Sequence, residues 1–344
     1  MYTVAELHFE LRGEIGSGGE GVVYQAFDKQ MNAILAVKVI PIGSFSNLDA
    51  FFDEARKLYL SRHHNVVPVQ YACTKDDKVY MAMPYYQRGS VAQLMKRRFL
   101  TVFEVVRYSL QFLSGLNNIH TKQLIHFDVK PENFLISDSD TVLLADFGVA
   151  QQVVAFGFAP VREVTEIYAP PEYFLQQSQH NLKFDIYQAG ISMYRMCNGS
   201  EMYIEQVIKA ATVRGKKDNQ NYIDALTAGK FMTNPPFLPH IPRSLRKVVR
   251  KAIKPNPDDR YDSILDMLNA LSRIDDTNLW QFTKNSETNL VWTLENSEVT
   301  ALNNGTVWQI TALKNGRRKN DFCATGLDDA QKEALLTECF KEKW

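Results

Sequence analysis

Residues 124–148 read LIHFDVKPENFLISDSDTVLLADFG, and this stretch decides the fold. Two strand-like apolar runs flank a polar segment that extends from His126 to Asn133. Pro131 prevents a helix from continuing through that segment, so the segment is predicted to be a fixed loop. Asp128 and Lys130 stand in the loop, and Asp146 follows Asp128 by eighteen residues. A carboxylate that can accept a proton, a lysine cation and further side-chain oxygens that can bind a metal thus stand near the ends of predicted strands. This combination suits phosphate chemistry.

A glycine-rich segment lies upstream, with Gly16, Gly18 and Gly21 in the spacing G-x-G-x-x-G. In dinucleotide-binding folds such a loop runs into a helix, whereas here Val22–Phe27 has the pattern of another strand. The glycines are therefore predicted at the tip of a β-hairpin, where their backbone N–H groups can approach a phosphate chain. Taken alone, the segment is explained equally well as a glycine-rich hairpin with no ligand.

Lys38 follows Ala36-Val37 within an apolar strand-like run. A lysine buried in such a strand is unfavourable unless a carboxylate pairs with it. Glu54, on a helix predicted over residues 47–61, is the expected partner. A lysine on an edge strand that points to water is the alternative.

Together these elements resemble the signature set of the eukaryotic-type (Hanks-type) protein kinase family. The resemblance covers roughly residues 8–274 and adds three elements to those above: the segment Tyr168–Glu172, Asp185 and Arg260. Asp185 resembles the aspartate that anchors the catalytic loop of these enzymes, and Arg260 resembles the partner of Glu172.

The resemblance implies ATP and Mg²⁺, or Mn²⁺ in its place, as cofactors, and it assigns roles by position. The catalytic residues would be Asp128, Lys130, Lys38, Glu54 and Thr165, and the metal ligands Asn133 and Asp146. The nucleotide would contact Ile15, Gly16, Gly18, Gly21, Val23, Ala36, Lys38, the gatekeeper Met83, the hinge residues Tyr85 and Tyr86, Ser90, Leu135 and Asp146. Pro84 stands where an acidic hinge residue is common in the family, so the hinge has one N–H fewer.

One departure from the family concerns regulation. Phe127 replaces the arginine that most members use to receive an activation-loop phosphate, which makes this the non-RD (HFD) subtype. The loop 149–172 contains no serine, and its only threonine, Thr165, stands where the family uses threonine to bond the catalytic Asp and Lys. We therefore expect activity without activation-loop phosphorylation, with Phe127 packing on apolar residues of the loop such as Val153 and Phe156.

Lys130 and Thr165 also resemble the serine/threonine branch of the family rather than the tyrosine-directed branch. The expected activity is transfer of the γ-phosphate of ATP to serine or threonine hydroxyls of protein substrates. Two alternatives remain open: a pseudokinase scaffold that binds nucleotide or a partner, and a kinase-fold enzyme that acts on small molecules or transfers nucleotidyl groups. The intact Lys38, Asp128, Asn133 and Asp146 argue against the scaffold.

The fold class expected from the pattern is α+β with two lobes. Five strands and one helix are predicted for residues 1–86, followed by a mainly helical lobe over 87–274, so that 1–274 forms one kinase domain. Within the second lobe, residues 198–242 look irregular, and the basic run Val213–Asn219 is interpreted as solvated surface.

Residues 275–344 resemble no family that can be named. Asn304-Gly305 and Asn315-Gly316 predict tight turns between alternating strands, and an amphipathic helix is predicted over 327–343. These elements indicate a small α+β module. A stabilising appendage and a docking module for a substrate or partner both remain open as its role.

The overall composition indicates which classes of binding partner and which compartment to expect. Of the 344 residues, Lys+Arg and Asp+Glu each number 39, so no net charge points to nucleic acid or a membrane surface. The four cysteines form no CxxC pattern, which fits a reducing cytoplasm. The N-terminus has charged residues where a signal peptide needs an apolar run, and the longest uncharged apolar stretch, residues 147–161, is too short to span a bilayer. A cytoplasmic protein is expected.

Overall fold

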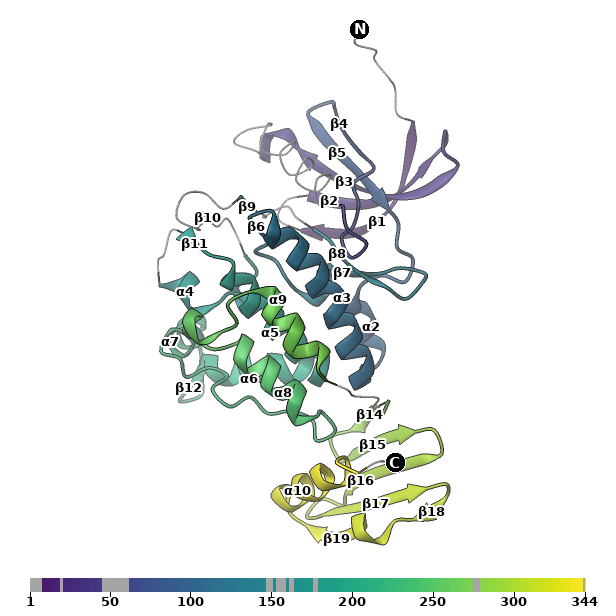
Figure 1. The fold of residues 1–344 in the computed structure, drawn as a ribbon, viewed down its shortest axis with the longest axis vertical. Coiled ribbons are helices and arrows are strands. Elements are labelled where there is room, and N and C mark those ends of the chain that lie inside the picture. Colours follow the sequence, from purple (N-terminus) through teal and green to yellow (C-terminus); the bar gives the residue numbers. More distant parts are fainter. Residues whose placement is uncertain are drawn as a thin grey trace.

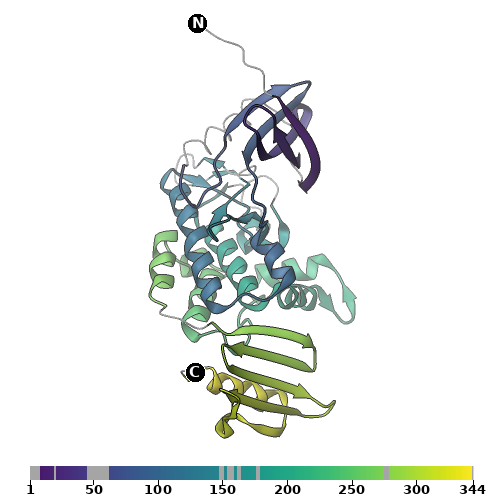
Figure 2. The same cartoon turned by 90° about the vertical axis from the view of Figure 1, so that its right-hand side faces the viewer.

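The computed structural model describes residues 8–18, 21–44, 62–146, 151–152, 159–160, 164–175, 179–274, 279–342 and 344. Three parts follow one another along the molecule: an N-terminal sheet, a helical body, and a second sheet that carries the C-terminal helix (Figure 1). A view from the side shows the same order (Figure 2). The helix predicted over 47–61, and with it Glu54, lies outside the described residues.

The N-terminal lobe is a five-stranded antiparallel sheet in the order β1-β2-β3-β5-β4. Its strands are β1 (Phe9–Gly18), β2 (Gly21–Asp28), β3 (Ala33–Pro41), β4 (Tyr71–Lys75) and β5 (Lys78–Pro84), and the short 3₁₀ turn η1 (Ile42–Ser44) follows β3. Asp76 and Asp77 join β4 to β5 with φ values of 48° and 54°, the two left-handed positions of the turn that matches strand twist. The five strands predicted for this lobe are confirmed.

The helical body contains eight α-helices among the described residues. They are α2 (Val91–Arg97), α3 (Val102–Thr121), α4 (Pro171–Phe174), α5 (Lys183–Asn198), α6 (Ser200–Ala211), α7 (Asn219–Thr227), α8 (Arg243–Ala252) and α9 (Ile264–Ser272). The short strands are β6 (Leu124–Ile125), β7 (Phe134–Ile136), β8 (Val142–Leu144), β9 (Gln151–Gln152), β10 (Ala159–Pro160), β11 (Gln179–His180), β12 (Thr212–Val213) and β13 (Lys216–Lys217), and the 3₁₀ turns are η2 (Pro131–Asn133), η4 (Glu166–Tyr168) and η5 (Pro257–Asp259).

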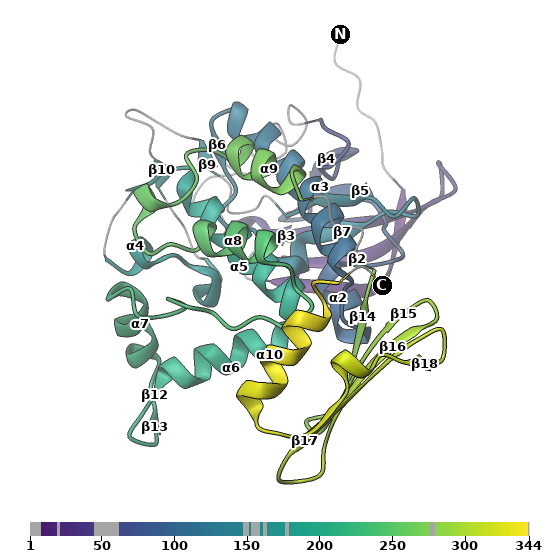
Figure 3. The same cartoon turned by 60° about the horizontal axis from the view of Figure 1, so that its bottom comes forward.

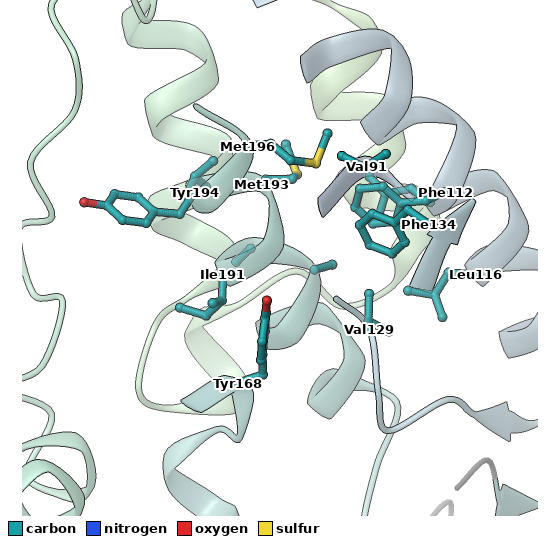
Figure 4. Packing of buried hydrophobic residues seen from close by; sticks show 14 of the residues in the cluster. Val91, Phe112, Leu116, Val129, Phe134, Tyr168, Ile191, Met193, Tyr194 and Met196 are labelled. Atoms are coloured by element: carbon teal, nitrogen blue, oxygen red, sulfur yellow. The ribbon is translucent and has the colours of Figure 1, made fainter. Parts of the chain in front are cut away.

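Helix α5 runs through the core of this body, because every residue from Phe184 to Asn198 is buried. A helix buried on all sides has to be apolar all round or to satisfy its polar groups internally. Figure 4 shows Met193 and Met196 of α5 on one side of the core and the stacked rings of Phe112 and Phe134 on the other. Those two rings lie 4.2 Å apart between centroids at an interplanar angle of 11°.

One part of the helical body differs from the prediction. Residues 198–242 looked irregular, but they form α6, the β12–β13 hairpin and α7. The apolar residues of α6 recur at helical spacing, because Tyr203, Ile204, Val207, Ile208 and Ala211 lie on one side of the helix. The prediction missed this pattern, although Tyr203 and Ala211 are buried as it indicates. Every residue of the basic run is exposed, as predicted.

The C-terminal module is an antiparallel sheet in the order β14-β15-β16-β17-β18, with β19 also paired to β17. Its elements are β14 (Gln281–Ser286), β15 (Asn289–Leu294), β16 (Ser297–Asn303), β17 (Trp308–Lys314), β18 (Arg317–Arg318), the 3₁₀ turn η6 (Asn320–Phe322), β19 (Ala324–Leu327) and α10 (Asp329–Cys339). Asn315 and Gly316 form the β17–β18 turn with φ values of 50° and 73°. Helix α10 covers one face of this sheet (Figure 3).

The module packs against the helical body through aromatic contacts. Phe99, in the loop between α2 and α3, meets Phe282 of β14 edge to face at 4.6 Å between ring centroids. Gln281 donates from Nε2 to the Phe99 carbonyl at 2.9 Å. Trp292 Nε1 donates to His240 Nδ1 at 2.9 Å, and His240 belongs to the loop before α8. The core of the module therefore continues into the helical body.

Phe99 also contacts the end of α5. A Cβ on Gly199, which follows α5 with φ +81°, would lie 2.7 Å from Phe99 Cε1. Glycine is required there because of both the left-handed backbone and the close approach of the ring. None of the helices among the described residues combines the length and the apolarity that crossing a membrane requires.

Candidate active site

The glycine-rich segment lies where β1 turns into β2. Gly16 pairs with Val23 and Gly18 with Gly21, so the segment is a hairpin tip, as predicted. Gly21 has a reason of its own to be glycine, because a Cβ there would lie 2.5 Å from the Val39 carbonyl oxygen. Around Gly16, by contrast, none of the described residues lies within 4 Å of such a Cβ.

Lys38 lies in the middle of β3 with its side chain largely buried. Its Nζ donates to Asp146 Oδ1 at 2.9 Å. The lysine charge, more than any other factor, lowers the pKa of Asp146 to about 2, so this carboxylate stays ionised at neutral pH. The pairing of Lys38 with Glu54 stays a prediction, because Glu54 lies outside the described residues.

Asp128 is the centre of a dense hydrogen-bond network. Lys130 Nζ lies 2.8 Å from Asp128 Oδ2 and donates to Thr165 Oγ1 at 2.8 Å. Thr165 Oγ1 in turn donates to Asp128 Oδ1 at 3.1 Å. Asn133 Nδ2 donates to Asp128 Oδ2 and to the Asp128 carbonyl, both at 2.8 Å. The contacts predicted for Thr165 are thus present, and four predicted site residues meet at one point.

Hydrogen bonds to Asp185 of α5 fix the loop that carries Asp128. Asp185 accepts from the backbone N–H groups of His126 and Phe127, both at 2.8 Å. Its Oδ2 also lies 2.8 Å from His120 Nε2. Phe127 adopts φ +65°, an unfavourable conformation for a bulky side chain. The buried carboxylate of Asp185 therefore stabilises a strained backbone directly before Asp128.

Burial determines the protonation of His126. Its Nδ1 accepts from the Asp128 backbone N–H at 3.2 Å, and its Nε2 lies 3.1 Å from the Ala145 carbonyl. Burial lowers the pKa of this histidine, so the ring is neutral and donates from Nε2. His126 thereby connects the Asp128 loop to the strand end that precedes Asp146.

Phe127 itself is fully buried. Its ring meets Phe184 edge to face at 4.9 Å and His180 at 6.4 Å between centroids. The apolar residues around it, among those described, are Ile125, Val164, Tyr173 and Leu182. Val153 and Phe156, which the sequence suggested as packing partners, lie outside the described residues.

Glu172 and Arg260 form a buried bidentate pair, with both N···O distances at 2.7 Å. Arg260 also donates to three carbonyl groups, those of Lys183, Lys254 and Pro255. The pair connects the segment after Thr165 to the η5 region of the helical body, as expected for these two positions.

Comparison with known proteins agrees with this geometry. The model of the protein kinase domain matches residues 9–270. The chain belongs to the protein kinase family. A probable serine/threonine-protein kinase of Clostridium acetobutylicum is 24% identical over 280 residues, which make up 79% of this chain and 40% of that protein.

Two other relatives show the same partial coverage. A probable serine/threonine-protein kinase of Clostridium perfringens is 26% identical over 287 residues, 81% of this chain and 40% of that protein. The inactive serine/threonine-protein kinase PLK5 of Mus musculus is 29% identical over 251 residues, 72% of this chain and 40% of that protein. This kinase chain therefore spans 40% of the length of each of the three.

The residues assigned to the kinase nucleotide pocket surround the junction of the two lobes. Ala36 pairs with Met83 across β3 and β5, and Val23 pairs with Lys38 across β2 and β3. Met83, Tyr86 and Leu135 pack beside the buried Val67, Leu143 and Ala145. Burial raises the pKa of Tyr86 to about 12, so its hydroxyl stays protonated. Ile15 is exposed and Tyr85 is half-buried.

Ser90 has a structural use that the sequence prediction did not include. Its Oγ accepts from Gln93 N at 3.2 Å, and Gln93 Oε1 accepts from Ser90 N at 3.0 Å, which completes a capping box at the start of α2. The assignment of Ser90 to the nucleotide stays a prediction.

The donor set fits a hard divalent cation. Asp146 supplies an ionised carboxylate, and Asn133 uses its Nδ2 toward Asp128, which leaves its amide oxygen for another partner. Among the described residues, no group of three or more His, Cys, Asp and Glu side chains could hold a metal by itself. A magnesium ion at this kinase site would therefore rely on one or two protein oxygens together with water and phosphate, which is its usual mode of binding.

Sequence analysis missed two supporting residues of the kinase loop. Gln188 accepts from Val129 N at 3.0 Å and donates to the Phe127 carbonyl at 2.8 Å. Ser192 donates to the Val129 carbonyl at 2.9 Å. Both are polar positions in a buried helix, three and seven residues after Asp185, and therefore on its face. That spacing was visible in the sequence.

Proposed function

We propose that this chain is an active serine/threonine protein kinase that uses ATP and Mg²⁺. The observation that carries the proposal is the set of contacts among Asp128, Lys130, Thr165 and Asn133, next to an ion pair of Lys38 with Asp146. A pseudokinase scaffold would not require these polar contacts to be maintained together. Protein substrates are supported by the buried Glu172–Arg260 pair, which fixes the segment beside Thr165.

The hydrogen bonds of Asp128 indicate how an acceptor hydroxyl would be oriented. Asp128 Oδ2 takes hydrogen bonds from Asn133 and faces Lys130, whereas Oδ1 takes one from Thr165. Each carboxylate oxygen has about two acceptor positions, so Oδ1 keeps one for a serine or threonine hydroxyl. Asp128 would orient that hydroxyl and accept its proton. Lys130 would face the transferred phosphoryl group.

Bound ATP would supply the phosphoryl group, and a magnesium ion held by Asn133 and Asp146 would neutralise phosphate charge. Lys38 would position the phosphate chain from β3, below the glycine hairpin. Because Lys38 and Asp146 contact each other directly, the two charges are already placed next to each other. Positioning and charge neutralisation are the main contributions that a protein makes to this reaction.

The test is transfer of label from [γ-³²P]ATP to a mixed serine/threonine/tyrosine peptide pool, followed by phosphoamino-acid analysis. D128N should lower kcat at least about 100-fold, since it removes the proton acceptor without changing size. D138N, at an exposed aspartate of the same lobe, is the matched control and should keep full activity. Nucleotide binding without transfer by the wild-type chain would favour the scaffold, and phosphotyrosine as the main product would contradict the serine/threonine assignment.

We also propose that activity does not depend on phosphorylation of the activation loop. Phe127 is buried among aromatic side chains, so no cation stands there to receive a phosphate, and Thr165 is engaged by Lys130 and Asp128. Phosphatase-treated kinase should show linear initial rates with Thr165 unmodified by mass spectrometry. A lag that disappears on preincubation with ATP, together with phosphate on Thr165, would refute this part.

A reducing cytoplasm is the proposed setting, supported by four cysteines that are all free thiols.

A further inference from the structure

A surface that combines cations with aliphatic side chains lies on α6 and the β12–β13 hairpin. We call it the hairpin surface, and it consists of Ile204, Ile208, Lys209, Val213, Arg214, Lys216 and Lys217, all of them exposed. The turn of the hairpin is made by Arg214 and Gly215, with φ values of 50° and 78°. Figure 3 shows the hairpin projecting from the end of α6, away from the C-terminal sheet.

The charge of this surface is unbalanced. From Ile204 to Asp218 four cations face two carboxylates, those of Glu205 and Asp218, although the chain as a whole has 39 of each sign. Asp218 Oδ1 accepts from Gln220 N at 2.9 Å as the cap of α7, so it is already engaged. Within the described part of the chain, none of the four cations forms an ion pair, whereas Arg195 pairs with Glu132 and Lys284 with Glu287.

Three exposed aliphatic residues lie on α6 and β12, the elements that carry or adjoin these cations in the sequence. Ile204 is 38% exposed and Ile208 is 42% exposed, one turn apart on α6, and Val213 of β12 is 51% exposed. Thr212 Oγ1 donates to the Ile208 carbonyl at 2.8 Å, which fixes the hairpin against the last turn of α6. Single exposed apolar residues are ordinary, but three within ten residues, on two elements that this hydrogen bond joins, favour a surface that binds something.

The hairpin surface is connected to the active site. Two residues after Lys217, Asn219 Nδ2 donates to Glu166 Oε2 at 3.1 Å. Glu166 directly follows Thr165, which bonds Asp128. Helix α7 packs against α4, and the elements α4, α7 and β12 follow one another along one side of the helical body (Figure 1).

We propose that the hairpin surface docks an acidic segment of the protein substrates, one that carries aliphatic residues and is separate from the phosphorylated serine or threonine. This inference rests on the proposed kinase function and names a feature of the substrates. The four cations, which form no ion pair with any residue that the structure describes, complement the acidic residues, and Ile204, Ile208 and Val213 contact the aliphatic ones. Tethering the substrate there raises the effective concentration of the acceptor hydroxyl at Asp128.

Other polyanions fit this surface less well. No aromatic side chain is present among its seven residues on which nucleic-acid bases could stack. Segments that bind anionic membranes carry about four to eight lysines and arginines, so the four cations here are at the lower limit. The three aliphatic residues are fewer than the apolar face of a helix that inserts into a membrane.

The test uses a serine/threonine acceptor peptide that the kinase phosphorylates, alone and joined through a Gly/Ser linker to an acidic segment containing Leu and Ile. In the wild-type chain the extension should lower KM about tenfold, which is the expected gain from tethering a weak second contact. K216E/K217E should lose this gain while turning over the unextended peptide normally. A basic extension should restore part of the gain in K216E/K217E, because two of the four cations are then replaced by carboxylates and the surface is net negative.

The matched control is R317E/R318E, which reverses two exposed cations on another hairpin and should keep the tenfold gain.

I204S/I208S, which replaces two of the aliphatic residues, should reduce the gain without affecting the unextended peptide. Fluorescence anisotropy of the labelled extension alone separates docking from catalysis, because it needs no phosphoryl transfer. Equal KM values with and without the extension, or binding of phosphatidylserine vesicles or a single-stranded oligonucleotide in place of the peptide, would overturn the proposal.

Discussion

At the scale of single residues, the site depends on side chains that serve two partners at once. Thr165 accepts from Lys130 and donates to Asp128 through one oxygen. Arg260 neutralises Glu172 and also satisfies three backbone carbonyl groups. Such residues affect activity or stability more than their size suggests, because removing one leaves several partners unsatisfied.

Thr165→Val should lower kcat by about 10- to 100-fold, because Asp128 and Lys130 lose the hydroxyl between them while the shape is kept. Thr165→Ser retains the hydroxyl and should keep most of the activity. Initial rates at saturating ATP and peptide measure this. Equal kcat for Thr165→Val and wild type would show that the contact has no catalytic importance.

Arg260→Met should destabilise the helical body by about 3–5 kcal/mol, because it leaves the Glu172 carboxylate buried without its cation. Urea unfolding followed by circular dichroism measures the loss. Lys183→Met removes a half-buried lysine whose partners Asp258 and Asp262 are exposed, and as the control it should change stability by less than about 1 kcal/mol.

At the scale of elements, α5 is the support of the catalytic loop. Asp185, Gln188 and Ser192 are spaced so that one face of the helix meets the backbone of residues 126–129. Those bonds hold the left-handed Phe127 directly beside Asp128. An α-helix buried on all sides can tolerate these polar groups only because each of them has a backbone partner.

Gln188→Leu should therefore lower kcat and stability together, since it leaves the Val129 N–H and the Phe127 carbonyl without their partner, at about 1–3 kcal/mol. Gln188→Glu keeps the acceptor for Val129 and should be less active than wild type but more active than Gln188→Leu. Thermal unfolding and initial rates measure both effects. Unchanged kcat in a folded Gln188→Leu chain would contradict a supporting role.

The sequence predicted the segments that form this site better than the hydrogen bonds that hold those segments together. The glycine hairpin, the loop from His126 to Asn133 and the turn at Asn315-Gly316 follow from local rules about glycine, proline and asparagine. Gln188 and Ser192 share a helix face with Asp185, which the sequence shows, but their partners are backbone groups 59 and 63 residues away, which no local pattern identifies. Helix α6 was missed although its apolar residues recur at helical spacing, because the basic run that follows it made the whole stretch look irregular.

At the scale of the whole molecule, the C-terminal module shares a core with the helical body. His240 is fully buried between them, with Trp292 donating to its Nδ1 and the rings of Phe282 and Phe340 at 5.8 and 6.0 Å. Arg246 of α8 donates to the Leu238, Pro239 and Ile241 carbonyls and so fixes the loop that carries this histidine.

Burial, with a smaller contribution from Arg246, lowers the pKa of His240 to about 3. In the unfolded chain the pKa of histidine is about 6.5, so between these two values the unfolded state binds the extra proton. The stability that depends on neutral His240 is thus fully present above pH 6.5 and falls as the pH decreases toward 3, by at most about 1.4 kcal/mol per pH unit.

The free energy of unfolding of the wild type should consequently decline between pH 7 and pH 5 more steeply than that of His240→Gln. Buried His126 contributes a slope in the same direction in both proteins, so the difference isolates His240. Urea titrations at several pH values provide the measurement. Parallel slopes for the two proteins would show that His240 does not control this interface.

The position of Phe99 affects how the two parts of this chain can evolve. Its ring lies between Gly199 at the end of α5 and Phe282 of the C-terminal module, which lies beyond residue 270, where the match to the protein kinase domain ends. A chain that lost the module would expose Phe99 and His240 to water, and a module moved to another protein would expose Phe282 and Trp292. The two parts are therefore expected to be inherited together, and recombination between residues 274 and 279 is expected to be counter-selected in either direction.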